Sequence, residues 1–304
     1  MKILISGLLN IETTVAVRGF PINYYPIDYP FFGVASAVSG VGYNLAKALT
    51  ALSDEVRLYT YLGNDDEADR VLRQLSRDGI AADGVSQTLQ STPTSVVLYD
   101  PDGRRQIYCD LKDIQEQSLP PASVDLDDCA IAAICNINFN RALIKEAKAK
   151  DILIATDVHV LRDIEDDYNR DFMENADILF LSDEALPSPP EAFIRRLHDR
   201  YHNRVIVIGM GSKGTMLLDG ATGRVFHLSA CHDVKVVNTV GAGDALFAAF
   251  LHYTAKGLSP IEALKRAEVF AAVKIETNGA SKGFCAEDEV EARLSLSDIS
   301  IKEL

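Results

Sequence analysis

The chain has 304 residues, of which 47% are hydrophobic, and this is enough for one large domain. Its 44 acidic and 30 basic residues give a formal net charge of −14, which argues against nucleic acid as a partner. No apolar run reaches the length of a membrane span, and five widely spaced cysteines without a C-x-x-C pair indicate free thiols, so we expect a cytoplasmic protein with no membrane partner.

The first third of the chain is predicted to contain both strands and helices. Three prolines exclude a helix from residues 21–30. Helices are predicted where apolar residues recur at helical spacing, as at Val41, Leu45 and Leu49. In chain order the predicted elements are strands 1–6, 13–20 and 31–36, helix 40–52, strand 56–62 and helix 65–77.

Two further strands, 94–99 and 105–109, flank the sequence Asp100-Pro101-Asp102-Gly103 and are predicted to form a hairpin. This hairpin and strands 13–20 and 31–36 do not fit a buried parallel core. We therefore predict a small β-sheet lid built from two insertions, about residues 12–36 and 94–109. Arg104 in the hairpin is a candidate substrate ligand, and the alternative is that its side chain points to water.

The middle of the chain carries short, continuously apolar runs at residues 131–135, 152–156, 178–181 and 205–208. Continuous apolarity indicates burial on both faces, as in a parallel sheet, and strands that alternate with helices are typical of the doubly wound α/β fold. Helices 244–256 and 259–276 follow, and residues 287–304 form a polar tail with one helix. We predict a single domain, residues 1–304, in which helices flank a mostly parallel sheet that carries the lid.

A glycine-rich turn, Gly241-Ala242-Gly243-Asp244, leads into a segment that is apolar on every face. A helix of this kind is buried, and its N-terminus offers free N–H groups and a positive dipole end to an anion, most often phosphate. Asp244 at the same place can accept a proton. Together these features predict phosphoryl transfer to a hydroxyl. The alternative is an ordinary turn in which Asp244 only starts the helix.

The sequence Gly209-Met210-Gly211-Ser212-Lys213-Gly214 has the form G-x-G-x-x-G and follows a predicted strand. A dinucleotide-binding fold would place this motif near the first strand and continue it with a helix. Here residues 215–219 are predicted to form a strand, which argues against a dehydrogenase.

Residues 238–244, Asn-Thr-Val-Gly-Ala-Gly-Asp, resemble the D-T-x-G-A-G-D signature of the PfkB family, the ribokinase-like carbohydrate kinases. Residues 39–46, Ser-Gly-Val-Gly-Tyr-Asn-Leu-Ala, are similar to the family's G-G-x-x-x-N-x-A signature. Residues 7–12 are similar to its opening G-x-x-N-x-D, and residues 209–214 stand where members carry T-L-G-x-x-G. The resemblance covers essentially the whole chain and implies a ribokinase-like fold.

The resemblance implies an ATP-dependent kinase that phosphorylates a hydroxymethyl group of a small sugar. It implies Asp244 as general base, the N–H groups of Gly241, Ala242 and Gly243 as the phosphoryl holder, ATP and Mg²⁺ as cofactors, and a homodimer formed through the lid. The implied sites are a sugar site with Asn10, Glu12, Gly40 and Asn44; a nucleotide site with Ser182, Gly209, Gly211, Gly214, Asn278 and Gly279; a magnesium shell with Asp183 and Glu184; and a monovalent-cation site with Asn238 and Thr239.

Two departures from the family pattern and the composition of the lid leave three points open. Asn238 replaces an acid beside the monovalent-cation site, which leaves a K⁺ requirement undecided. The family's N-x-x-E motif aligns with residues 182–185, where both fixed positions differ, so a sugar-binding regulator with impaired catalysis is a second hypothesis. An aromatic-rich lid can stack a base, so a nucleoside kinase of the same fold is an alternative.

Overall fold

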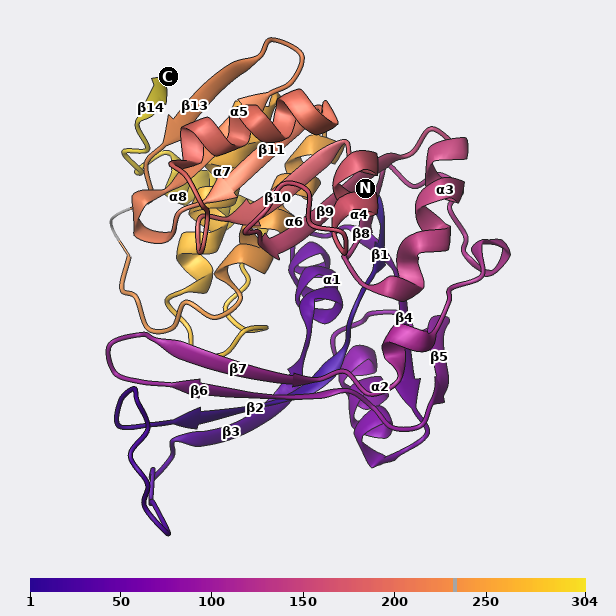
Figure 1. Ribbon diagram of the computed structural model, residues 1–304, viewed down its shortest axis with the longest axis vertical. Helices are drawn as coiled ribbons and strands as arrows, with labels where there is room; N and C mark the ends of the chain where they lie inside the picture. The colour runs from indigo at the N-terminus through magenta and orange to yellow at the C-terminus, as the bar shows by residue number, and fades with distance from the viewer. Residues whose placement is uncertain (232–233) are drawn as a thin grey trace.

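The computed structural model describes residues 1–231 and 234–304, and across these residues the strands form two sheets (Figure 1). The larger sheet contains ten strands, which lie side by side in this order: β14 (Ile301–Glu303), β13 (Arg224–Leu228), β12 (Thr215–Asp219), β11 (Val205–Gly209), β10 (Ile178–Ser182), β9 (Leu153–Val160), β8 (Ile131–Ile134), β1 (Lys2–Ser6), β4 (Glu55–Gly63) and β5 (Gly84–Leu89). No helix among the described residues combines the length and the hydropathy that a bilayer span requires.

The strands from β11 to β5 run parallel to one another. The four apolar runs predicted as parallel strands are β8 to β11, and the side chains of β8 are all buried. β12 and β13 continue the sheet antiparallel, because the connections from β11 are too short for a crossover helix. β5, β13 and β14 were not predicted, since each is short and has partly exposed positions that hide the apolar pattern.

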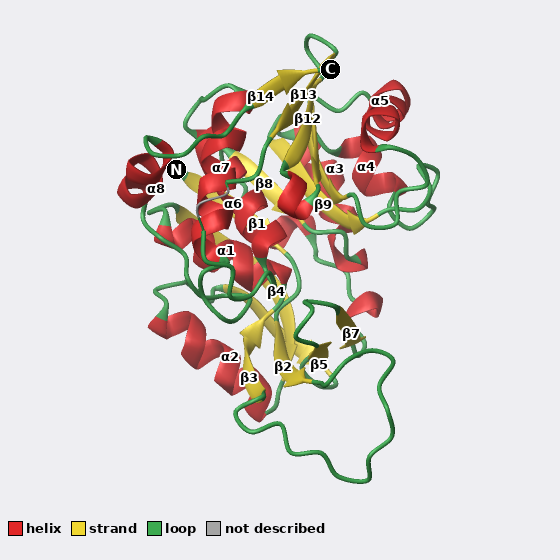
Figure 2. Cartoon of the chain, turned by 90° about the vertical axis from the view of Figure 1, so that its left-hand side faces the viewer, coloured by secondary structure: helices red, strands yellow, loops and turns green. Residues whose placement is uncertain are grey.

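Helices cover both faces of the large sheet, which confirms the predicted α/β class (Figure 2). One apolar core includes side chains from α1 (Val41–Ala51), α2 (Asp66–Arg77), α6 (Ala242–Ala255), α7 (Pro260–Lys274) and α8 (Glu287–Leu294). On the other side lie α3 (Arg141–Ala149), α4 (Arg170–Asn175) and α5 (Pro190–Tyr201). Short 3-10 turns occur at Ile114–Glu116, Pro121–Ser123, Asn138–Asn140 and Gly211–Lys213.

The two helices near the C-terminus differ slightly from their predicted bounds. α6 begins at Ala242, two residues earlier than predicted, because the N–H of Ala245 already donates to the carbonyl of Gly241 at 3.0 Å. α7 begins as predicted, since the Ser259 side chain accepts a hydrogen bond from the N–H of Glu262. α6 is buried from Ala245 to Tyr253, as its uniform apolarity predicts.

The smaller sheet has the strand order β3 (Val34–Ser39), β2 (Asn10–Ala16), β6 (Thr94–Tyr99) and β7 (Arg105–Asp110), so its strands come from both predicted insertions. The predicted strand bounds 13–20 and 31–36 are wrong. β2 pairs with β3 from Asn10 opposite Ser39 to Val15 opposite Val34, and Pro21, which has no N–H, cannot extend that ladder. Closure of this sheet over a substrate, and the treatment of residues 1–304 as one domain, stay predictions.

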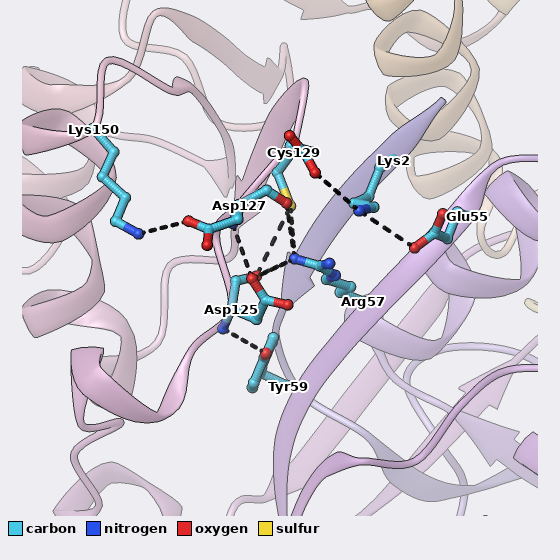
Figure 3. A network of polar contacts seen from close by, with 9 residues as sticks. Lys2, Glu55, Arg57, Tyr59, Asp125, Asp127, Cys129 and Lys150 are labelled. Atoms are coloured by element: carbon cyan, nitrogen blue, oxygen red, sulfur yellow. Dashed lines mark hydrogen bonds and ion pairs between the residues drawn. The ribbon is translucent and has the colours of Figure 1, made fainter.

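A polar network joins the amino ends of the central strands (Figure 3). Arg57 of β4 donates through Nη1 to the carbonyl oxygens of Asp125 and Asp127, both at 2.9 Å, and pairs with the Asp125 carboxylate at 2.7 Å. Lys2 lies 3.8 Å from the carboxylate of Glu55. Because Lys2 and Glu55 begin their strands, this network leaves the carboxyl edge of the sheet free.

Candidate active site

The direction of strand order reverses beside β1, with β4 and β5 on one side and β8 to β11 on the other. In open α/β sheets, ligands bind at the carboxyl ends of the strands at such a switch point. A cavity of about 320 Å³ lies there, lined by Leu8, Val41, Leu111, Gln115, Cys135, Asn136, Ile137, His159 and Tyr168. A larger hollow of about 490 Å³ lies on the surface of α3 and α4, away from β1, so we place the site in the smaller cavity.

We define the anion turn as residues 238–244, which comprise the segment before α6 and the first three residues of α6. Gly241 has a φ of 81°, and a Cβ at this position would lie 2.3 Å from the carbonyl oxygen of Ala280. The side chain of Asn238 accepts a hydrogen bond from the N–H of Val240 at 2.8 Å. Both the left-handed backbone and the close approach of Ala280 therefore require glycine at position 241.

The free N–H groups of the anion turn differ from those predicted. The N–H of Ala242 donates to the carbonyl of Thr239 at 3.1 Å, so it is not free. Within the described chain, the N–H groups of Gly241, Gly243 and Asp244 donate to no protein acceptor. The anion turn thus has free N–H groups at Gly241, Gly243 and Asp244, whereas the prediction named Gly241, Ala242 and Gly243.

Asp244 lies in the first turn of α6 and is partly exposed. Its Oδ2 accepts a hydrogen bond of 2.7 Å from the side-chain amide of Asn44 in α1. Burial raises the pKa of Asp244, while Asn44, His159 and Lys274 partly offset that shift by favouring the ionised form. The structure therefore places a carboxylate that is poorly solvated, and so more basic than usual, beside free N–H donors.

The polar residues of the predicted sugar site come from two elements. Asn10 and Glu12 lie on β2, and Asn44 lies on α1. The Asn10 amide donates to the Ser95 hydroxyl at 2.9 Å, while the Oδ1 atoms of Asn10 and Asn44 are buried without a partner in the described chain. Burial raises the pKa of Glu12, which accepts a hydrogen bond from Ser39 at 3.3 Å. These groups can accept hydrogen bonds from ligand hydroxyls.

Gly40 has a different function from the polar members of this group. Its φ is 100°, and a Cβ here would lie 2.4 Å from the carbonyl oxygen of Leu8. It lets the chain pass closely over the end of β1 before α1 begins.

Asp157 and His159, at the end of β9, were missed by the sequence reasoning. The His159 ring lies 3.4 Å from the Asp157 carboxylate and lines the cavity. Burial disfavours the charged form of the His159 ring, but the Asp157 carboxylate outweighs burial and raises the pKa of His159 to about 9. His159 also lies within electrostatic reach of Asp244. Their position directly after an apolar run was the available signal, because polar residues at carboxyl ends of parallel strands face the ligand crevice.

Lys274, the last residue of α7, was also missed. It is 0% exposed, and its ammonium group donates to the carbonyl oxygen of Val240 in the anion turn. Burial lowers the pKa of Lys274 to about 8, although Asp244 and Glu12 act in the opposite direction. In the sequence a lysine in the last turn of a helix indicates only an ordinary favourable contact with the helix dipole.

Part of the predicted nucleotide site lies at the ends of β10 and β11. Ser182 and Gly209 are paired in register, and the N–H of Asp183 donates to the carbonyl of Gly209 at 2.8 Å. The Ser182 hydroxyl accepts a hydrogen bond from the N–H of Glu184. The Asp183 carboxylate lies 4.0 Å from Lys213. The structure thus brings Ser182, Gly209 and the predicted magnesium residues together.

The three glycines of the 209–214 motif have different surroundings. A Cβ at Gly211 would meet no atom of the described chain within 4 Å, and one at Gly209 would meet a single backbone oxygen at 3.9 Å. A Cβ at Gly214 would lie 2.0 Å from the carbonyl oxygen of Leu228, so Gly214 allows close packing. The motif runs into β12 through a 3-10 turn and starts no α-helix, which contradicts the dehydrogenase alternative.

The predicted cation residues Asn238 and Thr239 belong to the anion turn, and the predicted nucleotide residues Asn278 and Gly279 lie next to it. The Asn238 amide donates to Oδ1 of Asn278 at 2.7 Å. Gly279, with a φ of 107°, follows Asn278, and Thr239 is exposed. In the described part of the chain no three His, Cys, Asp or Glu side chains are grouped to hold a metal ion.

Arg104 makes none of its contacts with the other predicted site residues. Its guanidinium pairs with Asp100 at 2.7 Å and with Asp102 at 3.4 Å, both in its own hairpin, and its Nη1 donates to the carbonyl of Phe20. These contacts hold the side chain at the tip of the smaller sheet, so its predicted contact with a substrate has no support in this arrangement.

Comparison with known proteins shows which family this chain belongs to. The model of the pfkB family carbohydrate kinases matches residues 3–287. The chain belongs to this family. Within the family it is similar to an acarbose 7(IV)-phosphotransferase of Actinoplanes sp., with 26% identity over 82% of this chain and 83% of that protein. It is likewise 26% identical to a ribokinase of Lactococcus lactis, over 88% of this chain and 89% of the ribokinase. This pfkB-family chain is therefore a phosphotransferase.

Solved structures confirm the ribokinase-like fold of this family member. A microbiome-derived acarbose kinase superposes with a TM-score of 0.85 and 23% identity, covering 97% of this chain and 98% of that one. A nucleoside kinase of Burkholderia thailandensis in complex with inosine gives 0.81 and 18% identity, covering 97% of each chain. A ribokinase-like protein of E. coli in complex with ATP and Mg²⁺ gives 0.78 and 21%, covering 97% and 99%.

Proposed function

We propose that this protein transfers the γ-phosphoryl group of ATP to a hydroxymethyl group of a small sugar, with Asp244 as general base. The observation that carries the proposal is the position of Asp244, which is bonded to Asn44 and adjoins the free N–H groups of the anion turn. A carboxylate there can take the proton of an attacking hydroxyl while the N–H groups hold the phosphoryl group.

ATP and Mg²⁺ fit the residues at the carboxyl edge. The backbone is open at Gly209, Gly211 and Gly243, where a Cβ would meet at most one atom of the described chain within 4 Å. Asp183 and Glu184 would serve the magnesium ion, which needs only one or two protein carboxylates because phosphate oxygens and water complete its shell. When bound, Mg²⁺ neutralises charge on the phosphate oxygens. The related fold that was solved with ATP and Mg²⁺ supports this part of the proposal.

An unphosphorylated sugar suits the cavity best. Gln115 and Asn136 supply amide groups to the cavity wall, and amide groups can hydrogen-bond sugar hydroxyls. The unpartnered Oδ1 atoms of Asn10 and Asn44, which are not among the lining residues, would accept further hydrogen bonds from a sugar that reaches them. Among the residues that line the cavity in the described chain there is no Lys or Arg to bind a phosphate already present on the sugar. The acarbose kinase and ribokinase relatives support a carbohydrate, and we place the reaction in the cytoplasm, where thiols stay reduced.

A screen of unphosphorylated sugars and nucleosides, with ATP, Mg²⁺ and ADP release as readout, tests the proposal. We expect saturable ADP release with at least one sugar, and ³¹P NMR should show a phosphate ester on a primary hydroxyl. Turnover of nucleosides alone would replace the sugar with the nucleoside alternative. Calorimetric sugar binding without transfer to any compound would instead contradict the kinase and favour the regulator.

A homodimer through the lid is part of the same proposal. Tyr24, Phe31 and Phe32, in the loop between β2 and β3, are 87%, 85% and 107% exposed. Clustered exposed aromatics are typical of a protein contact surface. Replacing Phe31 and Phe32 together with Asp is expected to halve the mass measured by light scattering. Leu296→Asp, at another exposed apolar position, should leave the mass unchanged; a monomeric wild-type protein would refute the dimer.

A further inference from the structure

Lys274 places a buried positive charge directly on the anion turn. Its ammonium group donates to the carbonyl oxygen of Val240, the residue before Gly241, and its side chain is fully enclosed. Burying an ammonium ion is unfavourable unless opposite charges and acceptors compensate for lost hydration. Here Glu12 and Asp244 lie within electrostatic reach of it, so the charge is compensated by groups of the proposed site itself.

The same place is where the family resemblance implies a monovalent cation, and the residues present do not fit one. Such an ion needs several oxygen ligands and a nearby negative charge. The carbonyl of Val240 already accepts from Lys274. Asn238, which stands where an acid is usual, carries no charge; its Oδ1 accepts from the N–H of Val240 and its Nδ2 donates to Asn278.

From this disagreement we infer that the Lys274 ammonium group takes the place of the monovalent cation, so that the anion turn works without K⁺. The hydrogen bond to Val240 holds the turn in the conformation that leaves the N–H groups of Gly241, Gly243 and Asp244 free. The positive charge favours an anion at the turn and the ionised form of Asp244. Lys274 is thus a positioning residue for the phosphoryl site, and this inference rests on the proposed kinase function.

The kinetic test compares wild type with Lys274→Met, which keeps the length of the side chain and removes its charge. Assays in KCl and in tetramethylammonium chloride at equal ionic strength should give wild-type turnover within about twofold of each other. Lys274→Met is expected to lose about 10²-fold in turnover without K⁺, and K⁺ or NH₄⁺ should restore part of it. Lys265→Met on the same helix, whose ammonium group pairs with Glu262 at 3.5 Å, is the matched control and should behave as wild type.

A second variant keeps the test independent of substrate identity. Asn238→Asp combined with Lys274→Met restores the acid and frees the Val240 carbonyl, so K⁺ should raise its melting temperature, and ²⁰⁵Tl⁺ NMR should detect cation binding. Wild type should show neither effect. A wild-type enzyme that requires K⁺, or Lys274→Met that is fully active without it, would overturn the inference. If no substrate is phosphorylated at all, the kinase proposal fails, while melting and ²⁰⁵Tl⁺ binding still decide the cation question.

Discussion

Asp244→Asn is expected to lower turnover by about 10³-fold, the middle of the range for loss of a general base. Asn has the same shape and can still accept the hydrogen bond that Asn44 donates at 2.7 Å, so the site geometry should persist. It cannot take the proton of the attacking hydroxyl. Steady-state kinetics with the substrate found in the screen, together with ATP binding by calorimetry, would show lost turnover with retained affinity.

The melting temperature and the pH dependence of kcat/KM distinguish a general-base role of Asp244 from a purely structural role. Since burial raises the pKa of Asp244, the ionised group is held at an energetic disadvantage, and Asp244→Asn should leave the melting temperature unchanged or higher. For the same reason the acid limb of wild-type kcat/KM should lie above the ordinary aspartate pKa of about 4. The control Asp171→Asn changes an exposed carboxylate on α4 and should alter none of these quantities. Near-normal turnover of Asp244→Asn would remove Asp244 from the mechanism.

Gly241→Ala should impair both folding and activity. Its φ of 81° costs a non-glycine residue about 1–2 kcal/mol, and the added Cβ would meet the Ala280 carbonyl oxygen at 2.3 Å. Because that obstacle is backbone, the turn must move, and we expect a loss of about 2–4 kcal/mol in the free energy of unfolding. Displacing the N–H donors should also reduce turnover by at least about 10²-fold. Urea unfolding and steady-state kinetics measure the two effects.

Substitutions at two other glycines separate the effect of backbone strain at Gly241 from the effects of packing and of phosphoryl binding. Gly257 has a φ of 83°, and a Cβ there would meet no described atom within 4 Å. Gly257→Ala should therefore lower the free energy of unfolding only by the cost of the left-handed backbone, and it should keep full activity. Gly243 lies in the first turn of α6 with open space around it. Gly243→Ala should therefore fold normally but weaken ATP turnover, since the methyl group would enter the space left for the phosphoryl group. If Gly241→Ala matches Gly257→Ala in both measurements, the packing against Ala280 has no functional importance.

Local pattern was enough for much of the fold. The continuous apolar runs that became β8 to β11 indicated a parallel sheet, because burial on both faces leaves no polar alternation. The wrong bounds of strands 13–20 and 31–36 arose where pairing decided the outcome: β2 starts at Asn10 because β3 and β6 lie beside it, and no local propensity reports that. β14 likewise depends on pairing with β13, a strand that lies far from it in the sequence.

The candidate site shows the same division. Local sequence indicated that residues 241–244 form a glycine turn before a buried helix, because glycine spacing and uniform apolarity are local properties, and it singled out Asp244. Asn44 was implied only by the family resemblance. Only the tertiary structure decided that Asn44 donates to Asp244 across 200 positions of sequence, that Ala242 has no free N–H, and that Lys274 and His159 lie within reach of the carboxylate. Those contacts depend on how α1, α6, α7 and β9 pack together. Packing brings residues into contact that are far apart in the sequence, and no local sequence pattern indicates which residues will meet.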